Sequence, residues 1–205
     1  MSVDAVSIYL QSDTREHIAL MHGLAERIDG DLVVVGYGED PDSGIALRPV
    51  IGHFPVGNID GTVQFVMGHA NEAHLNLYMA PAVYRHGLSY VSRGKKEDIV
   101  AVLGFVADFD DDNATNYIAR MPLPPHYVLE TSEDRFQAFL LLDKPVSPEE
   151  AEEAAKSLKS FCQCDHGTAD INHVWRIPGT LNWPNKKKVD AGRGKAPQLV
   201  KVVKP

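Results

Sequence analysis

Cysteine and long apolar runs are scarce in this chain of 205 residues, and both shortages exclude classes of protein. The two cysteines, Cys162 and Cys164, are too few for a disulfide framework and suit a reducing compartment. No apolar run approaches the roughly 18 residues that cross a bilayer, and the start M-S-V-D-A lacks the basic and apolar regions of a signal peptide. We therefore expect a cytoplasmic protein with no membrane partner.

The chain also lacks a phosphate-binding loop of the form Gly-x4-Gly-Lys-Ser/Thr, so it is not itself a P-loop ATPase. Its net charge of −8 argues against a general nucleic-acid binder. The charge is unevenly distributed, however, because residues 186–205 carry seven Lys/Arg and one acid, a net of +6. We expect contacts with a polyanion to concentrate there and near Arg85, Arg93, Lys95 and Lys96.

Local patterns predict an α+β fold in one domain that spans residues 1–205. The first helix is expected to use Thr14 as its cap and to end near Gly30. Ser147, Pro148 and Glu150 form a capping box that predicts a helix to about Phe161. A further helix is expected at 62–70, and strands are expected at 31–36, 46–51, 76–79, from 99, at 126–130, 136–142 and 198–203.

The strand that begins at Ile99 ends in four carboxylates, in the order A-D-F-D-D-D. Alternate strand residues share a face, so Asp108 and Asp110 point together, with Cα atoms about 6.6 Å apart. Two carboxylates that close repel each other unless a cation lies between them. Half of a metal site and a solvated acidic turn both fit this pattern. Asp111 and Asp112 are expected to belong to the turn.

A divalent-metal site needs further hard oxygen ligands, and the best third candidate is Asp170, with Asp165 behind it. Three carboxylates can hold two metals that clamp a phosphoryl transfer. Zinc bound by Cys162, Cys164, His166 and His173 is an alternative, but the C-x-C spacing on a helix end disfavours it.

Three motifs, F-V-A-D-F-D, T-S-E-D-R-F-Q-A-F-L-L and D-I-N-H-V-W-R-I-P-G-T-L-N-W-P-N-K, follow one another along the chain. Together they resemble the RepB-type primase domain of plasmids, phages and integrated elements, a branch of the archaeo-eukaryotic primase superfamily. The resemblance covers about residues 60–190 well and the first 55 loosely. It implies a catalytic core over about residues 59–205, like an RNA-recognition-motif (RRM) sheet with mixed or antiparallel strands and helices. A smaller N-terminal α/β part is expected over about residues 1–58.

The resemblance also implies template-directed nucleotidyl transfer with Mg²⁺ or Mn²⁺. Asp108 and Asp110 match the first metal motif, and Asp170 matches the third carboxylate. The middle motif of the superfamily usually carries Ser-x-His, where this chain has S-E-D-R-F-Q, so Gln137 and Arg135 are expected to replace the histidine. Arg176 matches the arginine of the R-I-P-G-T motif. Ser132, His173 and Lys186 complete the expected substrate contacts.

The resulting hypothesis is a DNA primase-polymerase, a nucleotidyltransferase of plasmid, phage or mobile-element replication. Its partners would be a single-stranded DNA template and NTP or dNTP, with a helicase or replication initiator supplied by another protein or a fused domain. Two alternatives remain open at this point. One is a non-catalytic DNA-binding module of replication, and the other is a metal-dependent nuclease or phosphodiesterase, because the same carboxylates could activate water.

Overall fold

The computed structural model describes residues 3–110, 114–119, 121 and 123–203. Asp111 and Asp112, the expected acidic turn, lie outside these residues. The α-helices are α1 (Val3–Leu24), α2 (Ile59–His69), α3 (Ala114–Ala119), α4 (Pro148–Cys162) and α5 (Lys186–Asp190), with short 3₁₀ helices η1 (Lys96–Asp98) and η2 (His166–Ala169). The strands are β1 (Asp31–Gly38), β2 (Val50–Pro55), β3 (Leu75–Met79), β4 (Ala82–Tyr84), β5 (Ile99–Phe109), β6 (Tyr127–Ser132), β7 (Arg135–Val146), β8 (Trp175–Arg176), β9 (Leu181–Asn182), β10 (Gln198–Leu199) and β11 (Lys201–Val203).

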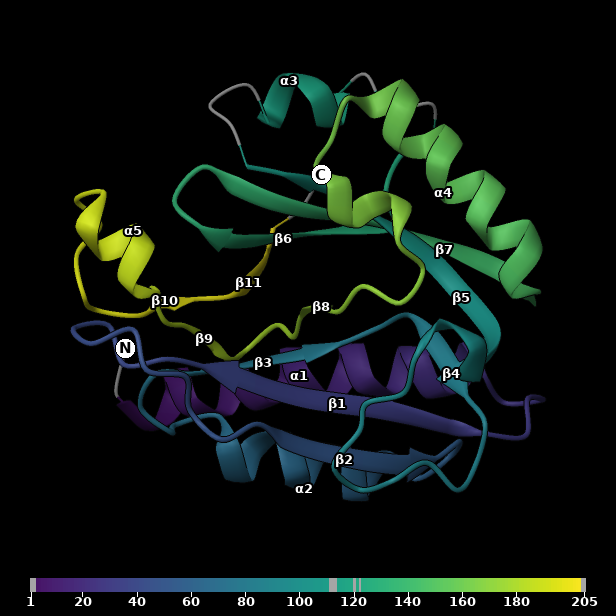
Figure 1. Ribbon diagram of the computed structural model, residues 1–205, viewed down its shortest axis with the longest axis horizontal. Helices are drawn as coiled ribbons and strands as arrows, with labels where there is room; N and C mark the ends of the chain where they lie inside the picture. Colours follow the sequence, from purple (N-terminus) through teal and green to yellow (C-terminus); the bar gives the residue numbers. More distant parts are fainter. Residues whose placement is uncertain (1–2, 111–113, 120, 122, 204–205) are drawn as a thin grey trace.

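Most strands belong to one strongly curved antiparallel sheet with the order β11-β6-β7-β5-β4-β1-β3-β8. Strand β2 extends it by pairing with β1, and β9 pairs with β10 apart from it. In Figure 1, α3 and α4 lie at the top, α1 lies behind β1 in the lower half, and α2 lies at the bottom beside β2. The expected α+β class is therefore confirmed. No helix in the described ranges is long and apolar enough to cross a membrane.

Strand β1 shows how the sheet is covered on both faces. Leu32 and Val34 pack in one cluster with Ile18 and Met21 of α1, whereas Val33 and Val35 pack in another with residues of α4. Alternate side chains of a strand point to opposite faces, so a run of four apolar residues buries both of them. Both faces of the sheet at β1 are therefore buried, one with α1 and the other with α4.

The local signals of α4 and of the hairpin before it predict the structure well. The Ser147 hydroxyl accepts a hydrogen bond from the Glu150 amide, and the Glu150 carboxylate accepts one from the Ser147 amide. Both bonds satisfy amides that a helix N-terminus leaves unpaired. Strands β6 and β7 form the expected hairpin, which places Gln137 opposite Asp108 of β5.

The prediction for Thr14 was wrong. Thr14 lies in the middle of α1, which begins ten or more residues earlier than a cap at Thr14 requires, and its side chain is buried. Its hydroxyl donates a hydrogen bond of 2.7 Å to the carbonyl of Pro178. Thr14, which the local sequence predicts to be a helix cap, therefore joins α1 to the loop that follows β8.

Three elements between residues 170 and 190 were not predicted as regular structure. Strands β8 and β9 have two residues each, and α5 has five. Such short elements carry no periodicity, and tertiary contacts fix them. Strand β8 pairs with Tyr78 and Met79 of β3, which fixes Arg176 against the N-terminal half of the sheet.

Candidate active site

Three carboxylates meet where β5 ends. Asp108 is near the end of β5, Asp110 follows that strand, and Asp165 precedes η2; one oxygen of each lies within 4.8 Å of the others. Carboxylate oxygens are the ligands that Mg²⁺ and Mn²⁺ prefer. The donor set therefore suits a hard divalent cation.

The backbone explains why Asp165 joins this cluster. Its amide donates a hydrogen bond of 3.0 Å to the carbonyl of Asp108. The Asp108 amide in turn donates to the hydroxyl of Thr168, at 3.2 Å. These two bonds hold the segment after α4 beside the free flank of β5, so its first acidic side chain lies next to Asp108.

Asp170, the third ligand expected from the sequence, lies outside this carboxylate cluster. The 3₁₀ helix η2 separates it from Asp165, and its Oδ1 accepts a hydrogen bond of 2.9 Å from the Asn172 amide. The structure thus favours Asp165, the second candidate, as the third carboxylate. Metal binding by any of these residues stays a prediction.

Burial raises the pKa of Asp108 to about 7, and the negative charges of Asp110 and Asp165 add to the rise. A hydrogen bond from Gln137 and the positive charge of Lys188 act in the opposite direction. Neighbouring groups thus offset the negative charge of the cluster only in part, and a bound cation would replace proton binding there. This environment fits a metal site better than a solvated turn.

Gln137 connects the carboxylates to the arginine of β8. It faces Asp108 across the β5–β7 pair and donates its side-chain amide to that carboxylate. Its Oε1 accepts a hydrogen bond of 3.1 Å from the Arg176 amide. Gln137 is buried, so both bonds fix its orientation.

Arg176 is a half-buried cation close to the cluster. Its guanidinium lies 4.5 Å from the centre of the Tyr78 ring, in a cation–π contact. Burial lowers its pKa, yet an arginine stays protonated in proteins. It therefore keeps a positive charge beside Asp108 and Asp110, whose charges act on it.

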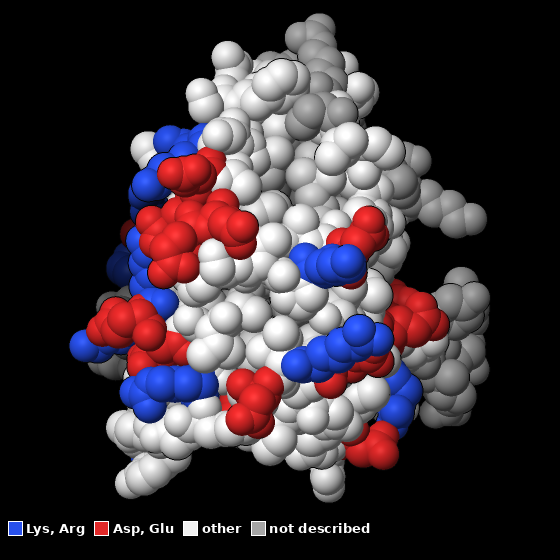
Figure 2. Space-filling view, turned by 90° about the vertical axis from the view of Figure 1, so that its right-hand side faces the viewer, with Lys and Arg blue, Asp and Glu red and all other residues white. Residues whose placement is uncertain are grey.

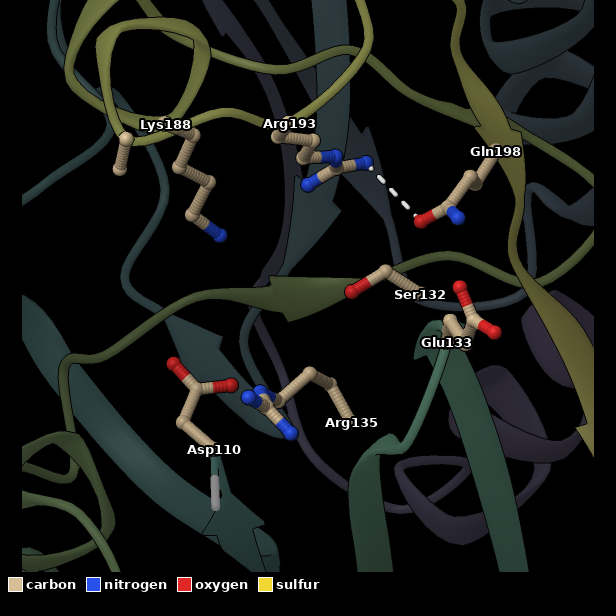
Figure 3. A pocket seen from close by; sticks show the side chains of 8 residues that line it. Asp110, Ser132, Glu133, Arg135, Lys188, Arg193 and Gln198 are labelled. Carbon is tan, nitrogen blue, oxygen red and sulfur yellow. Dashed lines mark hydrogen bonds between the residues drawn. The ribbon is translucent and has the colours of Figure 1, made fainter. Parts of the chain in front are cut away.

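A cavity of about 430 Å³ opens beside Asp110. Figure 3 shows Lys188 and Arg193 reaching into it from one side, and Asp110 and Arg135 from the other. Arg193 also donates a hydrogen bond of 3.1 Å to Gln198. Glu133 also lines the cavity, so two carboxylates and three cationic groups surround it, and a polyanion with a bound cation matches this mixture of charges.

Four expected substrate residues divide into two groups. Ser132 and Arg135 line the cavity beside Asp110. Lys186 and His173 do not, since the Lys186 ammonium pairs with Asp190 at 2.8 Å and the His173 ring packs against Trp175 with centres 4.4 Å apart. Substrate contact by all four stays a prediction, and the geometry favours the first two.

Sequence reasoning missed Lys188 and Arg193. Both belong to the basic C-terminal stretch, and that charge asymmetry was the available signal. It could not choose among three successive lysines, because the choice depends on how the five-residue helix α5 is oriented. The zinc alternative gains no support. Cys162 and Cys164 are buried, and among the described residues the only group of three side chains placed to hold a metal ion consists of carboxylates.

A family model described as the RepB DNA-primase N-terminal domain matches residues 96–203. The match covers more than half of the chain and includes β5, the β6–β7 hairpin and β8. The chain belongs to the RepB DNA-primase family. This membership confirms the resemblance drawn from the three sequence motifs, and no curated protein matches the chain in addition.

Solved structures of primases share the fold of this family member. The AEP domain of the cyanophage S-2L primase-polymerase (PrimPol) matches with a TM-score of 0.60 and 14% identity, over 92% of this chain and 89% of that one. The catalytic domain of primase RepB′, in complex with initiator DNA, matches with a TM-score of 0.54 and 18% identity, over 93% and 84%. A second RepB′ structure matches at 0.53 and 18%, and the chain spans only 56% of it. At these identities the likeness concerns the fold.

Proposed function

We propose that this domain is a primase-polymerase that joins nucleotides on a single-stranded DNA template. The observation that carries the proposal is the cluster of Asp108, Asp110 and Asp165 beside a cavity lined by Lys188, Arg193 and Arg135. Primase family membership and the initiator DNA bound to RepB′ support it. A helicase or replication initiator would act as a partner, in the replication of a plasmid, phage or mobile element.

The three carboxylates would hold two divalent cations, Mg²⁺ or Mn²⁺. Such a pair lowers the pKa of an attacking hydroxyl and stabilises a leaving pyrophosphate. Carboxylates on two segments that are hydrogen-bonded to each other keep the ligand oxygens close before any cation binds. The raised pKa of Asp108 means that binding at neutral pH displaces a proton from it.

The cationic residues would bind and orient the triphosphate. Arg135, Lys188 and Arg193 line the cavity from different elements, so they can contact different phosphates. Arg176 would add a fixed positive charge, because Gln137 and Tyr78 hold its backbone and its guanidinium. Such preoriented charge stabilises a transition state without reorganising when the reaction occurs.

Primer synthesis on a single-stranded template, with Mg²⁺ or Mn²⁺ and either NTPs or dNTPs, tests the proposal. Asp108→Asn and Asp110→Asn should each lower product formation by about 10³-fold or more, because a two-metal site that loses a ligand no longer holds both ions. Asp143→Asn is the matched control, since Asp143 is an exposed acid on β7, the strand that pairs with β5, and should leave synthesis unchanged.

Equal synthesis by wild type and Asp108→Asn would refute the proposal. DNA binding that survives both substitutions, with no synthesis by wild type in either metal, would instead identify a non-catalytic module. Degradation of a labelled single strand without added nucleotides would identify a nuclease.

A further inference from the structure

A second cavity, of about 210 Å³, lies next to the first, and Lys188 lines both of them. Its walls come from β1, β3, β8 and the segment that joins β9 to α5, so the two halves of the chain both contribute. None of the three clustered carboxylates lines it. It is therefore a separate compartment beside the proposed phosphate site.

Aromatic rings form much of this second cavity. Tyr37 and Tyr78 line it from neighbouring strands, with ring centres 6.2 Å apart. His74 and Trp183 form a second pair, with centres 4.8 Å apart. Flat π surfaces of this kind stack on nucleobases, whatever the base.

The backbone is built to hold the ring of Trp183 in place. The Trp183 amide donates a hydrogen bond of 2.7 Å to Asn76 Oδ1, and Asn76 Nδ2 donates to the Trp183 carbonyl at 3.3 Å. His74 has a left-handed backbone with φ of 65°, which is uncommon outside glycine and is found at functional sites. Gly38 allows this approach, because a Cβ there would lie 1.9 Å from the His74 carbonyl oxygen.

Three side chains of the wall carry a buried nitrogen without a hydrogen-bond partner: His74 Nδ1, Arg176 Nη1 and Trp183 Nε1. Buried polar groups are almost always paired, so three unpaired nitrogens among the side chains that line one cavity are unusual. The arginine and tryptophan nitrogens can only donate, which calls for a ligand with acceptor atoms. Every nucleobase carries ring nitrogens or carbonyl oxygens that accept hydrogen bonds.

The size of the second cavity argues against a whole nucleotide. The cavity is smaller than the roughly 300 Å³ at which sites for larger organic ligands begin, so it suits one planar base and not a whole nucleotide. Its lining combines the cations Arg176 and Lys188 with the Glu39 carboxylate, which accepts a hydrogen bond from the Lys186 amide, so its volume and not its charge sets the limit. Phosphates are better accommodated in the first cavity.

We propose that this second cavity binds a single nucleobase, stacked on Trp183 and hydrogen-bonded to the donors around it, next to the phosphate site. This inference rests on the proposed function, which gives the domain a reason to bind a nucleobase. A template base that is being copied uses its hydrogen-bonding edge to pair with the incoming nucleotide. A pocket that contacts this edge therefore suits an unpaired base. Its source is either the template strand or a second, free nucleotide.

Metal-free binding measurements test this pocket, because they do not require catalysis. Fluorescence anisotropy would compare a labelled single-stranded oligonucleotide with one of abasic sites, and competition would compare a dNTP or NTP with tripolyphosphate. Trp183→Leu should weaken binding of a base-bearing ligand about 5- to 100-fold and leave the base-free ligand unaffected. A loss confined to the oligonucleotide assigns the pocket to the template, and a loss confined to the nucleotide assigns it to a free nucleotide.

Two further variants keep the test independent of folding. Trp183→Phe retains a ring and should lose less affinity than Trp183→Leu. Base-bearing ligands should quench the fluorescence of wild type but not that of Trp183→Phe, which keeps only Trp175. Tyr90→Ala is the control, since Tyr90 is 82% exposed and lines neither cavity.

The proposal is overturned if wild type binds base-bearing and base-free ligands equally, or if Trp183→Leu weakens both alike. Lack of primer synthesis would remove the proposed function but would leave a base-selective effect of Trp183 standing. Normal primer synthesis by wild type, together with no base-selective loss of affinity in Trp183→Leu, would refute only the base pocket.

Discussion

Lys188 is the cation that the two cavities share. Partial burial lowers its pKa, whereas the negative charge of Asp110 raises it. Its ammonium lies at the border between the proposed phosphate site and the proposed base pocket.

Lys188→Met should therefore raise KM for the nucleotide about tenfold, because a hydrogen bond to a charged group contributes about 1.5 kcal/mol or more. Steady-state primer extension at varied nucleotide concentration measures this change. Lys187→Met is the matched control: Lys187 is the preceding residue of the same helix, is exposed and lines neither cavity. Equal effects of the two substitutions would indicate only general attraction of a polyanion.

At the scale of elements, α4 covers the face of the sheet behind the carboxylates. Ala151 and Ala155 pack against β1 and β5, and Leu158 and Cys162 pack against the end of β5. The segment that carries Asp165 follows α4 directly. The position of α4 therefore determines where this segment starts relative to the end of β5.

Removing the cap of α4 should destabilise the domain. Ser147→Ala deletes the hydroxyl that accepts from the Glu150 amide and should cost about 1 kcal/mol, or about 2–4 °C in Tm for a domain of this size. Thermal unfolding followed by circular dichroism measures it. Ser157→Ala, in the exposed middle of the same helix, should leave Tm unchanged or higher, because alanine is the better helix former. A Tm unaffected by Ser147→Ala would contradict the role of the capping box.

At the scale of the whole molecule, His17 joins α1 to the far part of the sheet. Its ring is hydrogen-bonded to the Tyr127 hydroxyl at 2.9 Å and makes an edge contact with Phe139. Burial lowers the pKa of His17 to about 4. The unfolded chain therefore binds this proton at a higher pH than the folded chain does.

The free energy of unfolding should decrease as pH falls, because the buried His17 imidazole then becomes charged. The contribution is fully present above pH 6.5 and is lost as pH falls towards 4, and over that range it amounts to about 3 kcal/mol. Urea unfolding at pH 7 and pH 4.5 measures it. His17→Gln should be less stable at pH 7 but should lose less between the two values. His166→Gln, at an exposed position, should show the same change in free energy of unfolding between pH 7 and pH 4.5 as wild type. A wild-type change in His17→Gln would contradict the role given to His17.

Surface charge is also a property of the whole molecule. Figure 2 shows acidic and basic side chains interspersed over one face. Such a face attracts and repels a polyanion at once. The cationic groups of the cavity beside Asp110 are a better expected contact for phosphates.

Much of the fold could be predicted wherever a few neighbouring residues carry the signal. The apolar run of β5, the hairpin with Gln137 and the capping box of α4 each depend on periodicity or on hydrogen bonds within four residues. The Thr14 prediction failed because its hydroxyl binds a residue 164 positions away, which no local pattern reveals.

The sequence by itself therefore determined the pair Asp108 and Asp110 at the end of a buried strand, since alternation along a strand is a local rule. Only the tertiary structure decided which of Asp165 and Asp170 lies beside Asp108, because the answer depends on a backbone bond from the segment after α4 to the end of β5. It likewise decided which lysine of α5 faces the cavities. Contacts between distant segments settle such choices, and a linear pattern does not contain them.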